Sequence, residues 1–158
     1  MEFSEEKTVL TRQGYEEIQR ELNEILTVKR PAVVDRIREA RQLGDLSENF
    51  DYQDAKNTQA MIEARMKELK TIISHAVVIE SADNNGHVGI GSKVVVKDLG
   101  DGFEDEYTIV GPAESSPAHG KISHESCVGG ALMGQKAGEI VMVETHGGIC
   151  KYEIVSVQ

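Results

Sequence analysis

The sequence is poor in the residues that mark several large classes of protein. Its 158 residues include two cysteines, three prolines and no tryptophan, and aromatic residues make up 4%. Cys127 and Cys150 form no CxxC or Cys/His pattern, which argues against a disulfide framework and against a structural zinc site. We expect both thiols to be buried among apolar side chains.

Long hydrophobic segments are also absent. No apolar run approaches the roughly 20 residues that a membrane helix needs, and the acidic start, Met1 to Lys7, lacks the hydrophobic core of a secretory signal. These absences predict a cytoplasmic protein without a membrane partner. Lys and Arg number 17 against 27 Asp and Glu, giving a net charge of −10. Such a chain does not coat nucleic acid by bulk electrostatic attraction, so any contact with nucleic acid must be local.

Glycine is nearly missing from the first half of the chain. Residues 1–80 contain only Gly14 and Gly44 of the 15 glycines. This shift in composition predicts two parts, an N-terminal helical hairpin over residues 1–78 and a C-terminal globular domain over residues 79–158. The polar segment from Glu80 to Gly86 is the expected connector, and we expect proteases to cut there first.

The N-terminal part has the apolar spacing of a helical hairpin. Thr11 is a candidate N-cap, and apolar residues then recur at intervals of three and four. Pro31 interrupts this pattern and predicts a kink, but the pattern resumes and continues to Gly44. A second helix is expected to begin near Ser47, and each helix would span roughly 45 Å. The apolar positions are Tyr15, Ile18, Leu22, Ile25, Val33, Val34, Ile37, Ala40 and Leu43 in the first helix, and Ala55, Ile62, Met66, Leu69, Ile73 and Ala76 in the second.

The turn between these helices is strongly acidic. The stretch from Gly44 to Asp54 reads GDLSENFDYQD and contains no cation. A hairpin with a single seam cannot bury its end, so residues 44–52 should form an exposed tip. The mutual repulsion of the carboxylates destabilises the folded chain, and this favours a role for them at the tip. They are Asp45, Glu48, Asp51 and Asp54.

Aromatic and cationic residues lie close to this acidic stretch. Phe50 and Tyr52 either pack against the last apolar residues of the hairpin or contact a partner. Arg41 and Lys56 are each placed within about two helical turns of the tip, where they could guide an anionic strand toward the carboxylates.

The C-terminal part has the pattern of a small β domain. Segments rich in β-branched residues predict strands, and His146-Gly147-Gly148 predicts a hairpin turn between the last two. One short helix is expected over Ser126–Gly134. The predicted strands are Ser92–Leu99, Asp105–Gly111, Glu139–Thr145 and Ile149–Val157.

Several stretches together resemble one protein family. In chain order they are LTRQGYEEIQREL from Leu10, RP at Arg30, EARQLGDLSENFDYQDAK from Glu39, YTIVGPAE from Tyr107, KIS from Lys121 and ALMG from Ala131. They resemble the bacterial transcript cleavage factors of the Gre family. The resemblance runs from about Leu10 to Val157, and the GDLSEN stretch is its most specific part.

The resemblance implies a fold and a set of partners. The implied fold class is α+β, with an N-terminal antiparallel two-helix coiled-coil hairpin and a C-terminal FKBP-like antiparallel β domain carrying one short helix. The implied partner is the elongation complex of bacterial RNA polymerase. The globular domain would dock at the rim of the secondary channel, and the hairpin of a monomer would reach the nascent RNA 3′ end and the template DNA inside.

The resemblance also assigns roles at the tip. The factor is not a nuclease by itself; it donates acidic residues to the polymerase, which then cleaves backtracked RNA. Asp45 would hold Mg²⁺ jointly with the polymerase, and Glu48 would position the metal or a water molecule. The free protein is expected to bind no cofactor tightly. The supporting residues of the tip would be Ser47, Asn49 and Tyr52, and the basic patch for the RNA 3′ end would be Arg41 and Lys56.

Docking to the polymerase is assigned to the globular domain. By resemblance, Ser126, Cys127 and Gly134 contribute to it. Cys127 stands where the family commonly has proline, and Gln135 stands at a place that is often basic.

Three other functions stay open from the sequence. The extra carboxylates Asp51 and Asp54 are compatible with an inhibitory homologue that occupies the channel without stimulating cleavage. A prolyl isomerase would fit an FKBP-like fold, but that activity needs an aromatic-lined apolar pocket, and few aromatic residues follow residue 80. A free-standing nuclease would need walls that hold RNA and exclude water around the acidic residues.

Overall fold

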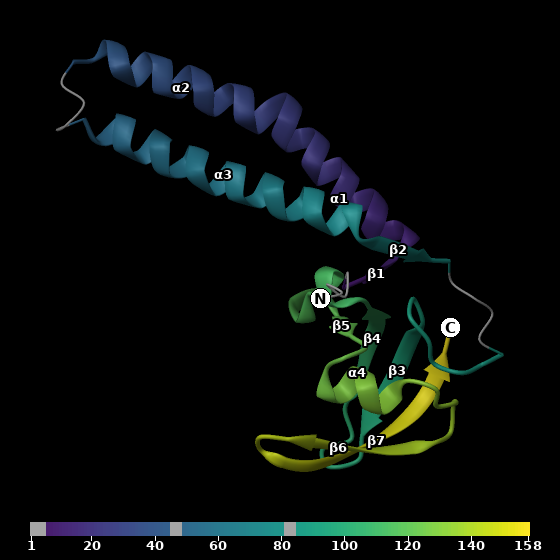
Figure 1. Cartoon of the computed structure of the whole chain (residues 1–158). Helices are drawn as coiled ribbons and strands as arrows, with labels where there is room; N and C mark the ends of the chain where they lie inside the picture. The colour runs from purple at the N-terminus through teal and green to yellow at the C-terminus, as the bar shows by residue number, and fades with distance from the viewer. Residues whose placement is uncertain (1–5, 45–48, 81–84) are drawn as a thin grey trace, which may run out of the picture. The chain divides into compact units, whose positions relative to one another are not determined.

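The structure, a computed structural model, describes residues 6–44, 49–80 and 85–158 (Figure 1). It consists of two compact units, one formed by Met1–Gly14 with Ala76–Gln158 and the other by Tyr15–His75. The first strand and residues 76–78 thus belong with the sheet in this division. Whether residues 1–78 and 79–158 fold separately stays a prediction.

The hairpin unit is built from three α-helices. They are α1 (Arg12–Glu24), α2 (Arg30–Gln42) and α3 (Phe50–Ser74), and a π-helical segment, Ile25–Lys29, joins the first two. Helices α2 and α3 run side by side (Figure 1). The α+β fold class with a long helical hairpin is therefore confirmed. The α3 helix begins at Phe50 with Asn49 as its cap, so the predicted start near Ser47 is wrong.

The π-helical segment lies directly before Pro31. In a regular α-helix the proline ring would clash with the carbonyl group of Thr27, four residues earlier. Here the backbone N–H of Arg30 donates to the carbonyl of Ile25, one residue further back than in an α-helix. The helical path continues through this wider turn, so the predicted interruption takes the form of a π-helical insertion.

The seam of the hairpin is apolar and is flanked by ion pairs. Arg30 pairs with Glu63 at 2.8 Å and Arg65 pairs with Glu21 at 2.7 Å, each joining residues far apart in sequence. The buried seam residues match the predicted spacing, which explains why two helices of this length stay together. They are Ile18, Ile25, Val33, Ile37, Ala40, Ala55, Met66 and Leu69.

The other unit contains two sheets. Strands β1 (Thr8–Thr11) and β2 (Ala76–Ile79) pair in parallel. A second sheet has the strand order β5-β4-β3-β7-β6. Its strands are β3 (Lys93–Asp98), β4 (Glu104–Val110), β5 (Lys121–Ser123), β6 (Ile140–Thr145) and β7 (Gly148–Val157).

The five-stranded sheet is mixed rather than wholly antiparallel, because β4 and β5 pair in parallel. Two short 3₁₀ turns, Pro112–Glu114 and Pro117–His119, carry the chain from the end of β4 back to the start of β5, which a tight hairpin cannot do. The short helix α4 (Cys127–Leu132) packs on β5 and β6 and covers the core. The core residues are Val88, Val94, Val96, Ile109, Ile122, Leu132, Val141, Val143 and Ile154.

The two cysteines differ in burial. Cys150 is half-buried, and Cys127, the first residue of α4, is exposed. The expectation of burial is therefore wrong for Cys127. Among the described helices, none is long and apolar enough to cross a membrane.

Candidate functional site

The acidic pair at the tip cannot be placed. Asp45 and Glu48, together with Ser47, lie outside the described residues. The structure describes the two helix ends that flank them. Gly44 has a φ of +118°, a conformation that favours glycine, directly after the last turn of α2.

Asn49 connects these two helix ends. Its side-chain oxygen accepts a hydrogen bond from the backbone N–H of Tyr52 at 3.1 Å, which caps α3. Its side-chain nitrogen donates to the backbone carbonyl of Ala40 in α2 at 2.6 Å. Since both ends of the amide are used, Asn49 holds the start of α3 against the last turn of α2.

The two aromatic residues near the tip have different surroundings. Tyr52 packs against a buried cluster formed by Val33, Ile37 and Ala55. The guanidinium carbon of Arg41 lies 5.8 Å from the centre of the Tyr52 ring, within range of a cation–π contact. Tyr52 is thus part of the hairpin core. Phe50 is 89% exposed, so its side chain is available to a partner.

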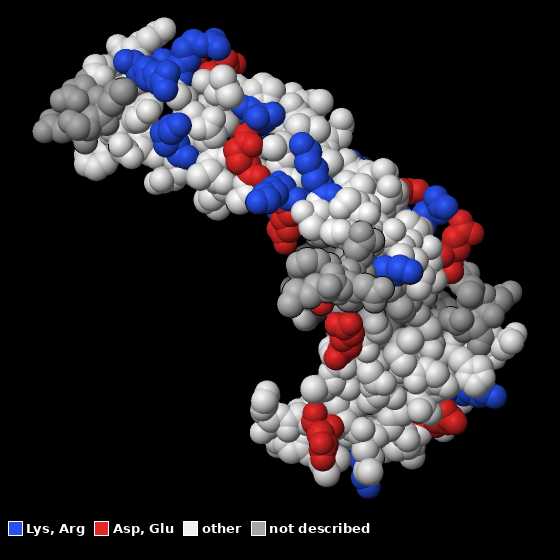
Figure 2. All heavy atoms as spheres, viewed as in Figure 1, with Lys and Arg blue, Asp and Glu red and all other residues white. Residues whose placement is uncertain are grey.

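Arg41 and Lys56 meet at one groove. The groove has a volume of about 420 Å³ and lies where α2 and α3 face each other. Among the residues that the structure describes, its lining consists of cations, amides and apolar side chains without a carboxylate, although the chain as a whole has a net charge of −10. Figure 2 shows Lys and Arg gathered over the hairpin. The lining residues are Val34, Ile37, Arg38, Arg41, Gln42, Lys56 and Gln59.

Three polar residues of this groove escaped the sequence analysis. They are Arg38, Gln42 and Gln59. Their spacing in the sequence could have identified them, because residues three or four positions apart lie on the same face of a helix. Residues 34, 38 and 41 share one face of α2, and residues 56 and 59 share one face of α3. The ammonium group of Lys56 donates to the side-chain oxygen of Gln59 at 3.2 Å, which orients the lysine along the groove.

The two other carboxylates of the acidic stretch, Asp51 and Asp54, are each stabilised by neighbouring groups of the hairpin. Asp54 forms an ion pair with Arg36 of α2, on the flank of the hairpin. Asp51 lies in the first turn of α3, where the helix dipole favours a negative charge. Asp54 therefore has a structural role that does not depend on a partner.

The predicted docking residues lie at opposite ends of α4. Ser126 caps the helix, because its hydroxyl oxygen accepts from the N–H of Gly129 at 3.0 Å, and Cys127 follows it. Gly134 lies beyond the other end with a φ of +78°, and its N–H donates to the carbonyl of Val88 at 2.9 Å. The structure thus brings Ser126 and Cys127 together but does not place Gly134 beside them.

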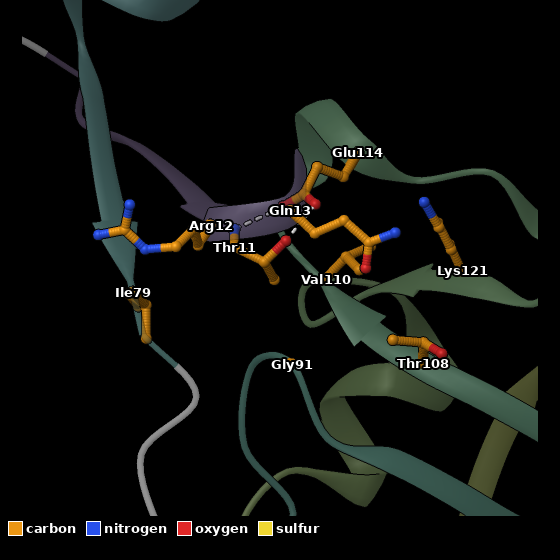
Figure 3. Close-up of a pocket in the computed structure, with 9 residues that line it drawn as sticks. All are labelled: Thr11, Arg12, Gln13, Ile79, Gly91, Thr108, Val110, Glu114 and Lys121. Atoms are coloured by element: carbon orange, nitrogen blue, oxygen red, sulfur yellow. Dashed lines mark hydrogen bonds between the residues drawn. The ribbon is translucent and has the colours of Figure 1, made fainter. Parts of the chain in front are cut away.

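Other ligand sites find little support within the described part of the chain. It contains no group of three or more His, Cys, Asp or Glu arranged to hold a metal ion. A cavity of about 240 Å³ in the sheet unit has no aromatic residue in its lining, unlike the pocket that a prolyl isomerase needs (Figure 3). Its lining residues are Thr11, Arg12, Gln13, Ile79, Gly91, Thr108, Val110, Glu114 and Lys121.

Comparison with known proteins gives matches along the whole chain. The family model described as "Transcription elongation factor, N-terminal" matches residues 8–78, and the one described as "Transcription elongation factor, GreA/GreB, C-term" matches residues 83–158. Transcription elongation factor GreA of Chloroflexus aurantiacus is 44% identical over 157 residues, which cover 99% of this chain and 100% of the relative.

Further relatives agree in length. Transcription elongation factor GreA of Bacillus cytotoxicus is 44% identical over 155 residues, covering 97% of this chain and 98% of the relative. Among solved structures, GreA factor homolog 1 (Gfh1) of Thermus thermophilus is 29% identical with a TM-score of 0.45, over 96% of this chain and 99% of that one.

Proposed function

Because this chain belongs to the GreA/GreB family of transcription elongation factors, we propose that it binds bacterial RNA polymerase and stimulates cleavage of backtracked nascent RNA. In this proposal the hairpin enters the secondary channel of the polymerase and releases arrested elongation complexes. One observation carries it: the acidic GDLSEN stretch follows the end of a helix that lines a groove with the cations Arg38, Arg41 and Lys56.

The acidic pair supplies oxygen ligands. Asp45 and Glu48 are three residues apart, and Mg²⁺ commonly takes one or two protein carboxylates while keeping other positions for water and phosphate oxygens. Two carboxylates alone would hold the ion weakly, so we propose that the polymerase supplies the remaining ligands. When bound there, Mg²⁺ polarises the scissile phosphate and lowers the pKa of a water nucleophile. Ser47 and Asn49 would keep the pair oriented.

The groove offers a place for the RNA 3′ end. Arg41 and Lys56 line it together, and Arg38 adds a third positive charge beside them. Phosphate oxygens are attracted to such a group of cations, although Arg38 also pairs with Asp35 of the same helix at 3.3 Å. The proposed role of the groove is to hold the displaced RNA while the acidic pair acts on the bond to be cut.

The proposed function can be tested by replacing a carboxylate of the acidic pair with the amide of the same shape, which removes the negative charge. We predict that Asp45→Asn and Glu48→Gln each lower stimulated cleavage by roughly a hundredfold or more, since loss of a residue that only orients a metal ligand already costs up to about that much. The measurement is release of 3′ RNA fragments from a stalled elongation complex, next to a competition assay for polymerase binding. Binding should change little, because the proposal assigns docking to the sheet unit.

Two controls sharpen this test. Raising Mg²⁺ should partly rescue Asp45→Asn, since weaker affinity for a ligand is offset by its concentration. The purified chain without polymerase should leave naked RNA intact. If the wild-type chain binds the polymerase but releases no fragment above the polymerase's own rate, the cleavage function is wrong and an inhibitory role in the channel replaces it.

A further inference from the structure

The cap of α1, Thr11, is bonded to a residue that lies 103 positions further along the chain. The carboxylate of Glu114 accepts two hydrogen bonds from Thr11, one from its backbone N–H at 2.8 Å and one from its hydroxyl at 2.6 Å. The Thr11 hydroxyl oxygen in turn accepts from the N–H of Gly14 at 3.0 Å. Dashed lines in Figure 3 join Thr11 to Glu114.

This arrangement is a capping box whose acid comes from outside the helix. In a local capping box, the residue three places after the cap is Glu or Gln and accepts from the backbone N–H of the cap. Here that place is Gly14, and Glu114 does the accepting instead. A Cβ atom on Gly14 would lie 1.8 Å from a carboxylate oxygen of Glu114. The glycine is therefore required for Glu114 to reach the helix.

The backbone also comes close to β1 at Gly111. A Cβ atom on Gly111 would lie 1.8 Å from the backbone oxygen of Val9 in β1. Gly111 and Glu114 belong to the YTIVGPAE stretch, and Thr11 and Gly14 belong to the LTRQG stretch. Two sequence stretches that the proposed function leaves without a role thus bind each other.

We propose that Glu114 is a positioning residue for the cleavage reaction. The atoms of this contact belong to one compact unit, and α1 continues from it into the hairpin unit. Glu114 ties the first turn of α1, the helix that continues into the hairpin unit, to the 3₁₀ turn that follows β4. This role rests on the proposed function. Its specific claim is that the bond between Thr11 and the 3₁₀ turn Pro112–Glu114 matters, beyond the capping of a helix.

Two variants separate these roles. Glu114→Ala removes both the acceptor for the Thr11 N–H and the bond between Thr11 and the 3₁₀ turn Pro112–Glu114. Gly14→Glu combined with Glu114→Ala restores a local capping box without restoring that bond. We expect both variants to lower the maximal rate of stimulated cleavage by about tenfold, the scale of a modest misplacement of reacting groups. The concentration of factor that gives half of this rate should change little in both.

The measurements are cleavage at saturating factor, half-saturating concentration and hydrogen exchange of the Thr11 amide in the free protein. Exchange should quicken in Glu114→Ala and slow again in the double variant. Glu144→Ala, an exposed glutamate on β6, is the matched control and should behave as wild type.

Specific results would overturn this role. If the double variant cleaves at the wild-type rate, Glu114 only caps the helix. If the half-saturating concentration rises while the maximal rate holds, Glu114 acts on binding. If wild type itself does not stimulate cleavage, the proposed function fails and the positioning role fails with it; failure of the positioning role alone appears only when wild type is active.

Discussion

At the scale of single residues, Lys56 differs from three arginines of the hairpin. Arg30, Arg36 and Arg65 each form an ion pair with a carboxylate of the opposite helix. Lys56 instead bonds to the neutral amide of Gln59 and lines the groove. A neutral amide, unlike a carboxylate, does not compete as an anion for the ammonium group, so Lys56 can attract an anionic ligand.

We predict that Lys56→Ala weakens binding of the RNA 3′ end by roughly 1 kcal/mol, which is about fivefold. The slope of this binding against salt concentration should fall by about the amount that one phosphate contact contributes. The measurement is the rate of fragment release from a backtracked complex over a range of salt concentrations. Lys97→Ala, on β3 of the sheet unit, is the control. An equal loss in both variants would show that bulk charge is responsible.

Single residues also show how far the sequence predicted the site. Arg41 and Lys56 were predicted from their distance to the acidic stretch, and the structure places them in one groove. The sequence predicts that the second helix begins near Ser47, whereas the structure has Asn49 as the cap of α3. Serine and asparagine are both good caps, so local sequence could not choose between them. The choice depends on the bond from Asn49 to Ala40, a contact across the hairpin.

At the scale of elements, long periodic segments were predictable and short ones were not. The helices and four strands of the larger sheet follow from apolar spacing and β-branched content. The missed strands are β1, β2 and β5, with four, four and three residues. A strand this short carries almost no pattern, and its partner lies elsewhere in the chain. Residues 76–79 therefore looked like the end of the second helix.

The ion pair that joins α1 to α3 predicts a dependence on pH. A hydrogen bond and charge attraction from Arg65 lower the pKa of Glu21 below its ordinary value, and the same contact raises the pKa of Arg65. A carboxylate with a lowered pKa in the folded state stabilises the fold above its unfolded pKa. This contribution is lost as the pH falls through the folded pKa.

We predict that Glu21→Gln lowers the free energy of unfolding by about 0.5 kcal/mol at neutral pH, the usual size for a partly exposed pair. The difference from wild type should vanish in acid, well below the ordinary range of glutamate. Urea unfolding at both pH values measures it, with Glu24→Gln, an exposed residue of α1, as the control. A difference that persists in acid would mean that packing, rather than charge, is responsible.

At the scale of the whole molecule, the hairpin is an insertion. Strand β1 precedes it, β2 follows it, and the two strands pair with each other in the sheet unit. The sheet unit is therefore completed by chain from both sides of Tyr15–His75. Composition could not reveal that β1 and β2 pair across the hairpin. The change in glycine content shows where the long helices end, but it does not show which short strands pair.

Limited proteolysis tests this organisation. We predict a first cut within Glu80–Gly86, because this segment is polar and rich in turn-forming residues. The two fragments should co-elute in gel filtration until denaturant is added, since Thr11 and Glu114 would lie on different fragments and still bond. Early separation would show that residues 1–78 are independent of the rest. A stable boundary inside residues 40–60 would contradict the two-part arrangement.

The distant cap of α1 has a consequence for synthesis on the ribosome. Thr11 and Glu114 are 103 residues apart. At about 5–20 residues per second, the nascent chain waits roughly 5–20 s between making the start of its first helix and making the carboxylate that caps it. Strand β1 likewise waits for Ala76–Ile79. Residues 8–14 thus leave the ribosome well before the residues that they contact, and a nascent chain that stops before Glu114 cannot complete these contacts.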